Sequence, residues 1–220
     1  MINNEAPVAH LDRVSVSEAE GSGFDSRRAH QALLIGFEPS LRKTIEPVSD
    51  VKNTPLKYFS AYSSNVQAQV NDLLQQGKLA DYLLQKYPLA HEVTTDKALY
   101  SYVLEVKNKF MRNAAPLNKA LFDSKIQVIK HALGLHTSIS RVQGGKLKTK
   151  REIRIASLFK NVPVEFLNMI TVHELAHFKQ HDHNKAFYLL CTSMERDYHQ
   201  FEFDLRLYAT HLDVQKQPLW

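Results

Sequence analysis

The pattern of hydrophobic and polar positions changes along the chain, and its first part shows no sustained period. Residues 1–54 are polar and rich in Ser, Asn, Arg and Glu, so we expect a poorly ordered segment there. Apolar residues then recur every three or four positions over 64–77 and again over 79–87, which predicts two short helices. A third, longer helix is expected after Thr95, a residue type that caps helix starts. Residues 55–115 should therefore form a helical N-terminal part.

Part of the polar N-terminal segment has an unusual sequence. The run Phe24-Asp25-Ser26 and its neighbours resemble the translation of a transfer-RNA gene, whose T-arm can be read as Phe-Asp-Ser. We therefore expect the native protein to start after about residue 30. The intact mass of the native protein would show whether Met1 is retained.

The second half of the chain carries a strand pattern followed by a strongly apolar helix. Positions 152–157 alternate between polar and apolar residues, which predicts a half-buried strand and, with the glycines before it, a hairpin over 136–159. Residues 164–178 are apolar around most of the helical circumference, so we expect a central buried helix with Asn161 as its N-cap. Two further helical patterns follow, at 186–194 and 198–212.

These elements predict an α+β fold. Residues 116–215 should form one domain in which the central helix packs on a small antiparallel sheet. Additional helices are expected at its N-terminal and C-terminal sides. The hairpin is the reason for expecting antiparallel strands, because two strands joined by a tight turn run in opposite directions.

Composition narrows the class of protein. With 220 residues and 44% hydrophobic content, the chain can bury one good core. No apolar run approaches the roughly 18 residues of a membrane-spanning helix. The single cysteine, Cys191, excludes an intramolecular disulfide and lies in an apolar helical stretch. We therefore expect Cys191 to be a core residue and the protein to be cytoplasmic.

Positive charge is concentrated just before the central helix. The net charge is +5, and six of the 28 cationic residues surround a Gly-Gly turn: Arg141, Lys146, Lys148, Lys150, Arg151 and Arg154. One interpretation is a solvated hairpin tip, and the other is a site where Arg154 or a lysine contacts a phosphate or an acidic substrate. Few aromatic residues accompany the cluster, which argues against sequence-specific nucleic-acid binding.

The central helix carries the candidate chemistry in the run His173-Glu174-Leu175-Ala176-His177. Side chains four residues apart share one helical face, so His173 and His177 can bind one ion, with Glu174 about 100° round the helix. Zinc lowers the pKa of a bound water to about 7, and a neighbouring carboxylate can accept its proton. We expect His173 and His177 to be metal ligands, Glu174 to be the general base, and one Zn²⁺ to bind per chain.

Residues after this motif could supply a third ligand. His181 would lie about 12 Å from His173 along a continuing helix, too far for both to share one tetrahedral ion. His183 lies beyond the expected helix end, between Asp and Asn residues that tolerate turns, so the chain could fold back and bring it to the metal. Glu195, on a later helix, is the carboxylate alternative. We favour His183 and keep Glu195 as the second candidate.

The stretch from His173 to Phe187 reads His-Glu-Leu-Ala-His-Phe-Lys-Gln-His-Asp-His-Asn-Lys-Ala-Phe. It resembles the active-site segment of the YgjP-like metallopeptidases, a branch of the zincin hydrolases. The resemblance implies a zincin-like fold with His173, His177 and His183 as ligands and Glu174 as the base. It covers the second half of the chain.

We therefore expect a zinc-dependent metallopeptidase in which Glu174 activates a metal-bound water, with the substrate aligned along the strand at 154–158. The first alternative is a metal-dependent nucleotide phosphoanhydride hydrolase, a nucleoside triphosphate pyrophosphatase that uses the basic 141–154 hairpin. The second is a metal-stabilised binding module without catalysis, although structural zinc sites are normally rich in cysteine. The expected partner is a peptide or protein substrate, or a nucleotide. The oligomeric state is not encoded in these patterns.

Overall fold

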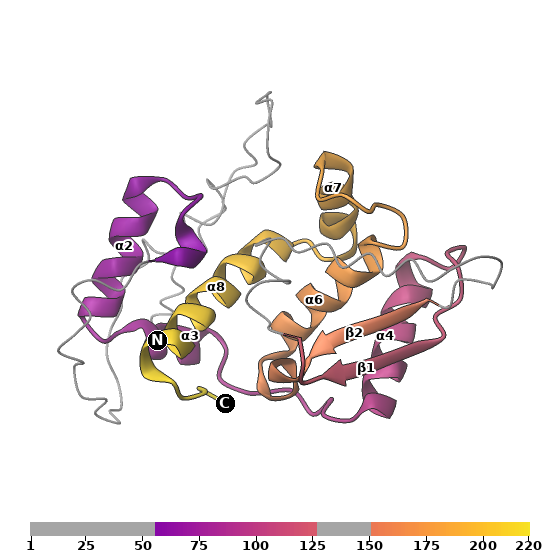
Figure 1. Cartoon of the computed structure of the whole chain (residues 1–220), viewed down its shortest axis with the longest axis horizontal. Helices are drawn as coiled ribbons and strands as arrows, with labels where there is room; N and C mark the ends of the chain where they lie inside the picture. The colour runs from indigo at the N-terminus through magenta and orange to yellow at the C-terminus, as the bar shows by residue number, and fades with distance from the viewer. Residues whose placement is uncertain (1–55, 127–150) are drawn as a thin grey trace, which may run out of the picture.

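The computed structural model describes residues 56–126 and 151–220, which form an α+β arrangement (Figure 1). Six α-helices, two 3-10 helices and two strands lie within these ranges. In chain order they are η3 (Lys57–Phe59), α2 (Ser64–Gln75), α3 (Leu79–Lys86), α4 (Asp96–Phe110), β1 (Lys119–Asp123), β2 (Glu152–Ala156), η4 (Ser157–Asn161), α6 (Val164–Ala176), α7 (Lys185–Met194) and α8 (Tyr198–Gln215). The predicted segment 1–54 and most of the predicted hairpin lie outside the described residues.

The two short N-terminal helices, α2 and α3, confirm the helical patterns that end at residue 87. The apolar residues Val66, Val70 and Leu74 of α2 are buried. Gly77 separates the two helices with a φ of 66°, a left-handed conformation that favours glycine. The division of the chain at residue 115 stays a prediction.

The predicted cap of α4 is confirmed, because the Thr95 hydroxyl oxygen accepts a hydrogen bond from the Ala98 N–H at 3.2 Å. The buried face of the helix includes Leu99 and Val103. Its first turn is also tied to the sheet, since the Phe122 N–H of β1 donates to the side chain of Asp96 at 2.9 Å. In Figure 1, α4 accordingly lies beside the sheet, where it contacts β1.

The sheet corrects the expected strand arrangement. β2 forms at the predicted alternating positions, with Ile153 and Ile155 buried. Its partner is β1, which no pattern above predicts, and the two strands run parallel from Lys119 opposite Glu152. The expected antiparallel sheet is therefore wrong for the described residues. The long connection between Asp123 and β2 permits this, because parallel strands need a crossover of a dozen or more residues.

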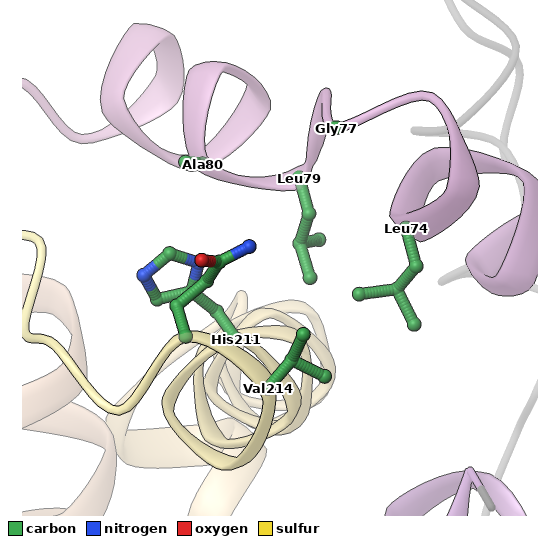
Figure 2. Close-up of a pocket in the computed structure, with 7 residues that line it drawn as sticks. Leu74, Gly77, Leu79, Ala80, His211 and Val214 are labelled. Carbon is green, nitrogen blue, oxygen red and sulfur yellow. The ribbon is translucent and has the colours of Figure 1, made fainter. Parts of the chain in front are cut away.

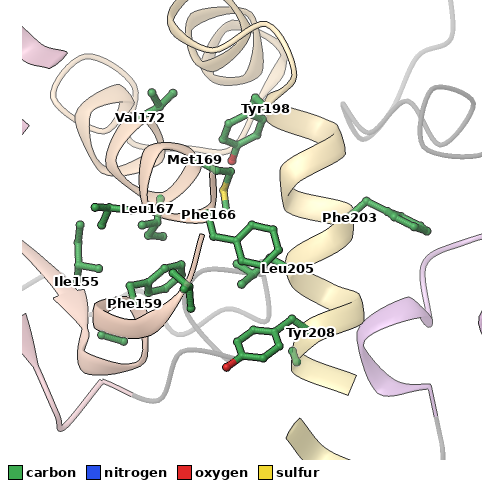
Figure 3. Close-up of a cluster of buried hydrophobic side chains, with 14 of the residues drawn as sticks. Ile155, Phe159, Phe166, Leu167, Met169, Val172, Tyr198, Phe203, Leu205 and Tyr208 are labelled. Atoms are coloured by element: carbon green, nitrogen blue, oxygen red, sulfur yellow. The ribbon is translucent and has the colours of Figure 1, made fainter. Parts of the chain in front are cut away.

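The central helix α6 is buried as predicted, but it begins differently. Phe166, Leu167 and Met169 have no exposed surface and lie between the sheet side and α8 (Figure 3). Asn161 is not the N-cap, because it ends the 3-10 helix η4, and Pro163 takes the cap position without a side-chain hydrogen bond. Proline fits this position since its fixed φ and missing N–H cost nothing at a helix start.

The helices α7 and α8 close the core. The Asn184 side chain caps α7 by accepting a hydrogen bond from the Phe187 N–H at 3.0 Å. α8 contacts α3, α6 and α7 and buries Phe203, Leu205 and Tyr208 (Figure 3). Across the described ranges, every helix is too short or too polar to cross a membrane. The zincin-like character of the fold stays a prediction.

Candidate metal centre

Three histidine side chains converge where α6 ends. His173 lies in the last turn of α6, His177 is the residue that caps its end, and His183 precedes the start of α7. The Nε2 atoms of His177 and His183 lie 3.3 Å and 3.1 Å from Nε2 of His173. The possible ligand atoms of the three residues all lie within 4.8 Å of one another. The three side chains could therefore hold one metal ion.

The spacing of these nitrogens fits a tetrahedral site. Two imidazole nitrogens bound to zinc at about 2.0–2.1 Å stand roughly 3.3 Å apart when the geometry is tetrahedral. The Nε2 separations of His177 and His183 from His173 are close to this value. Such close nitrogen lone pairs repel one another unless a proton or a cation lies between them. A set of imidazole ligands suits zinc and other transition metals better than magnesium or calcium.

The outward-facing ring nitrogens have partners that orient two of the rings. Nδ1 of His177 lies 2.9 Å from the carbonyl oxygen of Gln180. A carbonyl only accepts, so this Nδ1 carries the proton and Nε2 presents its lone pair to the centre. Nδ1 of His173 lies 2.8 Å from the hydroxyl of Tyr198, which is 25 residues away in sequence. Only the packing of α8 against α6 brings these two residues together, so no local sequence pattern pairs them.

Phe187 forms an apolar wall behind the three histidines. Its ring centroid lies 5.0 Å from that of His173 and 4.7 Å from those of His177 and His183. The Phe187 side chain has no exposed surface. The Asn184 cap fixes the backbone of α7 at Phe187, so the wall is held in place. Phe187 therefore restricts ring rotation and keeps water from this side of the cluster.

Burial favours the neutral forms of His173 and His177. Desolvation, followed by the charges that His177 and His183 would carry, lowers the pKa of His173 to about 3. Desolvation also lowers the pKa of His177, against the effect of its hydrogen bond to Gln180. Neutral imidazole is the form that binds metals, so these two side chains need to release little or no proton before a metal ion can bind.

Glu174 follows His173 on α6 and is half-buried. Burial raises the pKa of its carboxyl group to about 7. A carboxyl group with a pKa near neutral pH can accept a proton and later return it. The role of Glu174 as general base stays a prediction, and a pKa of about 7 is suited to it.

The other candidate ligands lie outside the cluster. α6 ends at Ala176, so the helical stripe does not continue to His181, which is exposed. The Glu195 carboxylate accepts hydrogen bonds from the Asn168 side chain and the Asp197 N–H. Among the described residues, the group that could hold a metal contains His183 and not Glu195.

Two arginines of the predicted basic segment fall within the described residues. Arg154 pairs with Asp123 at 3.0 Å and with Glu152 at 2.7 Å, so carboxylates offset its charge. The guanidinium group of Arg151 instead lies over the ring of Phe178, 5.1 Å from its centroid. Phe178 directly follows His177, which places the positive charge of Arg151 at the C-terminal end of α6. The remaining four cations lie outside the described residues: Arg141, Lys146, Lys148 and Lys150.

A small cavity lies at the other end of α8, between this helix and the connection from α2 to α3 (Figure 2). Leu74, Leu79, His211 and Val214 are among the residues that line it. Its volume of about 20 Å³ has room for one water molecule. Pockets for small molecules measure about 300–1,000 Å³, so this cavity is not a substrate site.

Comparison with known proteins identifies the class to which this fold and site belong. The YgjP-like metallopeptidase domain matches residues 119–207, which run from β1 into α8 and include all three histidines and Glu174. The chain is also 54% identical, over 159 residues, to the UTP pyrophosphatase of Escherichia coli strain K12. That match covers 72% of this chain and 95% of the relative. The chain therefore belongs to the YgjP-like family. No solved structure matches it.

The similarity to a UTP pyrophosphatase corrects the expected function. The metallopeptidase that the His-Glu-x-x-His motif led us to expect is wrong, and the peptide substrate aligned along β2 loses its support. The physical reason is that histidines holding a metal beside a carboxylate can serve water attack on a carbonyl or on a phosphoryl centre. The motif therefore indicates hydrolysis without specifying the bond. What holds is the coarser conclusion that the chain is a hydrolase whose three histidines could bind a metal ion.

Proposed function

We propose that this protein is a metal-dependent nucleoside triphosphate pyrophosphatase with UTP as its substrate. Water would cleave the phosphoanhydride between the α- and β-phosphates, giving UMP and pyrophosphate. The observation that carries the proposal is the 54% identity to a UTP pyrophosphatase across 95% of that relative. A nucleotide substrate also agrees with the cytoplasmic location that the sequence predicts.

His173, His177 and His183 would hold the metal ion in this reaction. The convergence of their Nε2 atoms and the neutrality of His173 support this role. We propose zinc, because three imidazoles with one open position are a common catalytic arrangement for that metal. A divalent ion bound here would supply Lewis-acid stabilisation of the charge on the phosphate oxygens.

Glu174 would act as the general base. Its pKa of about 7 allows it to take a proton from the attacking water at neutral pH and to release that proton afterwards. Phe187 would contribute indirectly. Its ring packs against the three histidine rings and would hold the metal ligands in fixed positions during proton transfer to Glu174.

Arg151 would bind the triphosphate. A substrate with about four negative charges needs nearby cations, and guanidinium groups bind phosphate through paired, charge-assisted hydrogen bonds. Among the ion pairs of residues 56–126 and 151–220, none includes Arg151, whereas Arg154 is held by two carboxylates. Within these two ranges no carboxylate offsets the charge of Arg151, which lies beside the end of α6.

The test is a product analysis with the full chain loaded with zinc. The protein is incubated separately with UTP, CTP, ATP, GTP and an unstructured protein such as casein, and products are separated by chromatography. The proposal expects UMP and pyrophosphate in equal amounts from UTP, lost after treatment with a chelator and restored by zinc. Absence of nucleotide turnover by the folded, zinc-loaded protein would overturn it, as would UDP and phosphate as the products.

A further inference from the structure

We propose that Tyr198 is a positioning residue for the metal site, whose hydroxyl accepts the Nδ1 proton of His173 and so turns the Nε2 lone pair of that ring toward the metal. The inference rests on the metal-binding role proposed for His173. It assigns a function to a residue of α8 that no sequence motif marks.

The geometry of the hydrogen bond carries the first step. The Tyr198 hydroxyl lies 2.8 Å from Nδ1 of His173, and only 1% of Tyr198 is exposed. A buried hydroxyl requires a partner, and a buried imidazole nitrogen does as well. Figure 3 shows Tyr198 at the start of α8, on the side that faces α6. The two side chains therefore satisfy each other in the interior.

The second step concerns which atom donates. Nε2 of His173 is the atom that lies near Nε2 of His177 and of His183, so Nε2 is the atom that would bind the metal. A metal-bound Nε2 leaves the proton of the neutral ring on Nδ1, and the tyrosine oxygen must then accept it. Without metal, the proton can sit on Nε2 and Nδ1 can accept from the tyrosine instead. Metal binding would thus move one proton from Nε2 to Nδ1 with no change in the charge of His173.

The third step concerns the hydroxyl proton of Tyr198, which needs an acceptor of its own when the hydroxyl oxygen accepts a hydrogen bond from His173. The thiol of Cys191, which is fully buried in α7, contacts the Tyr198 hydroxyl. Sulfur is a weak acceptor that can take this proton in a hydrogen bond. Burial and then the nearby charge of Glu202 raise the pKa of Tyr198 well above its usual value, so the side chain stays a neutral hydroxyl.

Two residues on the same face of α8 as Tyr198, one and two turns further along, help to fix the position of the tyrosine. Glu202 and Arg206 follow Tyr198 at four-residue intervals and form an ion pair at 2.7 Å, with both side chains largely buried. Arg206 also donates to the backbone carbonyl of Tyr58 in η3 at 3.2 Å. This connection fixes the rotation of α8 about its axis, which in turn fixes the direction of the Tyr198 hydroxyl.

The test is the zinc affinity of Tyr198→Phe, which removes only the hydroxyl, measured against a competing chelator. We expect affinity to fall about 10- to 100-fold, the usual effect of losing a hydrogen bond to a metal-binding histidine. The cobalt-substituted variant should also show a changed visible absorption spectrum, which a purely structural loss would leave unaltered. The matched control is Tyr208→Phe, since Tyr208 is equally buried on the same helix but packs against Phe166 and Trp220. This control should keep the affinity and spectrum of the unmodified protein.

A second measurement needs no variant. Long-range ¹H–¹⁵N correlation spectra of the zinc-loaded wild-type protein should show His173 with a proton on Nδ1 and metal on Nε2. Metal on Nδ1, or an unchanged zinc affinity in Tyr198→Phe, would overturn the inference while leaving the proposed function intact. Failure of the wild-type protein to bind zinc at these histidines would overturn the metal site itself, and the inference with it.

Discussion

The Nε2 atom of His183 lies 3.1 Å from that of His173, although the two residues are ten positions apart and α6 ends between them. The chain turns back after the helix, and the Gln180 N–H donates to the Ala176 carbonyl at 2.9 Å in this turn. The Asn184 cap then starts α7 immediately after His183. The turn after α6 and the Asn184 cap of α7 therefore set the position of His183.

Replacing His183 by alanine should remove metal binding. The loss of one of three ligands should weaken zinc affinity by more than the roughly 100-fold upper effect of losing an outer hydrogen bond. Zinc should consequently raise the melting temperature of the variant much less than that of the wild type. The matched control is His181→Ala, because His181 is exposed and lies outside the cluster. Equal zinc stabilisation of the two variants would argue against His183 as a ligand.

Replacing Arg151 by alanine should impair substrate binding. A hydrogen bond to a charged group contributes about 1.5–3 kcal/mol, so kcat/KM for UTP should fall roughly 10- to 100-fold, mainly through a higher KM. Arg154→Ala serves as the control and should change kcat/KM by less than about threefold, because that charge is already paired with Asp123 and Glu152. Steady-state kinetics on both variants distinguish the two arginines. An equal loss in both would indicate a general effect of positive charge.

Replacing Phe187 by leucine should loosen the metal site more than it unfolds the protein. Leucine is smaller and cannot contact all three histidine rings. The lost burial and the small cavity left behind should cost about 1–3 kcal/mol of stability. Phe203→Leu is the matched control, since Phe203 is equally buried but packs against Phe59 and Tyr62. Denaturant unfolding should show similar losses for both, and zinc affinity should fall only for Phe187→Leu. Unchanged zinc affinity in Phe187→Leu would show that the wall has no effect on the site.

Acid should destabilise the fold partly through His91. Its Nδ1 accepts from the Val93 N–H at 3.0 Å, and its Nε2 lies 2.8 Å from the carbonyl oxygen of Phe159 and must donate to it. Burial lowers the pKa of His91 despite this bond. The unfolded chain therefore takes up a proton near the ordinary pKa of about 6.5, while the folded protein does so only at lower pH. Stability from this group is present above about pH 6.5 and is lost as the pH falls toward the folded pKa.

The measurement for His91 is the melting temperature of the wild type and of His91→Gln between neutral and mildly acidic pH. Glutamine can donate a hydrogen bond but does not titrate in this range. The variant should start less stable and lose less stability on acidification than the wild type. If the melting temperature of the variant falls with pH as steeply as that of the wild type, His91 does not contribute to acid unfolding.

The sequence predicts most helices of the described residues because their signals are local. The Thr95 cap and the uniformly apolar face of α6 each act within one or two helical turns. Asn161 is a wrong cap for the same reason, since the residues after it do not reveal that η4 ends there. The strand β1 is harder to predict, because it is a short apolar run whose parallel partner lies across a long connection.

The residues of the candidate site also fall into those that local sequence predicts and those that depend on tertiary packing. The spacing of His173 and His177 is a local property of a helix, and the turn before α7 makes His183 predictable. Tyr198 depends on the packing of α8 against α6, which no local pattern contains. The predicted peptide substrate is wrong because a metal-bound water and a carboxylate can attack a peptide bond and a phosphoanhydride by similar chemistry. The bond that is cleaved depends on the groups around the centre, and we propose Arg151 as one of them.

The most direct test of the central claim is UTP hydrolysis by Glu174→Gln, with bound zinc measured in the same sample. Glutamine keeps the shape of the side chain but cannot accept a proton from water. The account predicts zinc binding like that of the wild type, together with release of pyrophosphate at least about 100-fold slower. A variant that binds zinc and still hydrolyses UTP at the wild-type rate would contradict it.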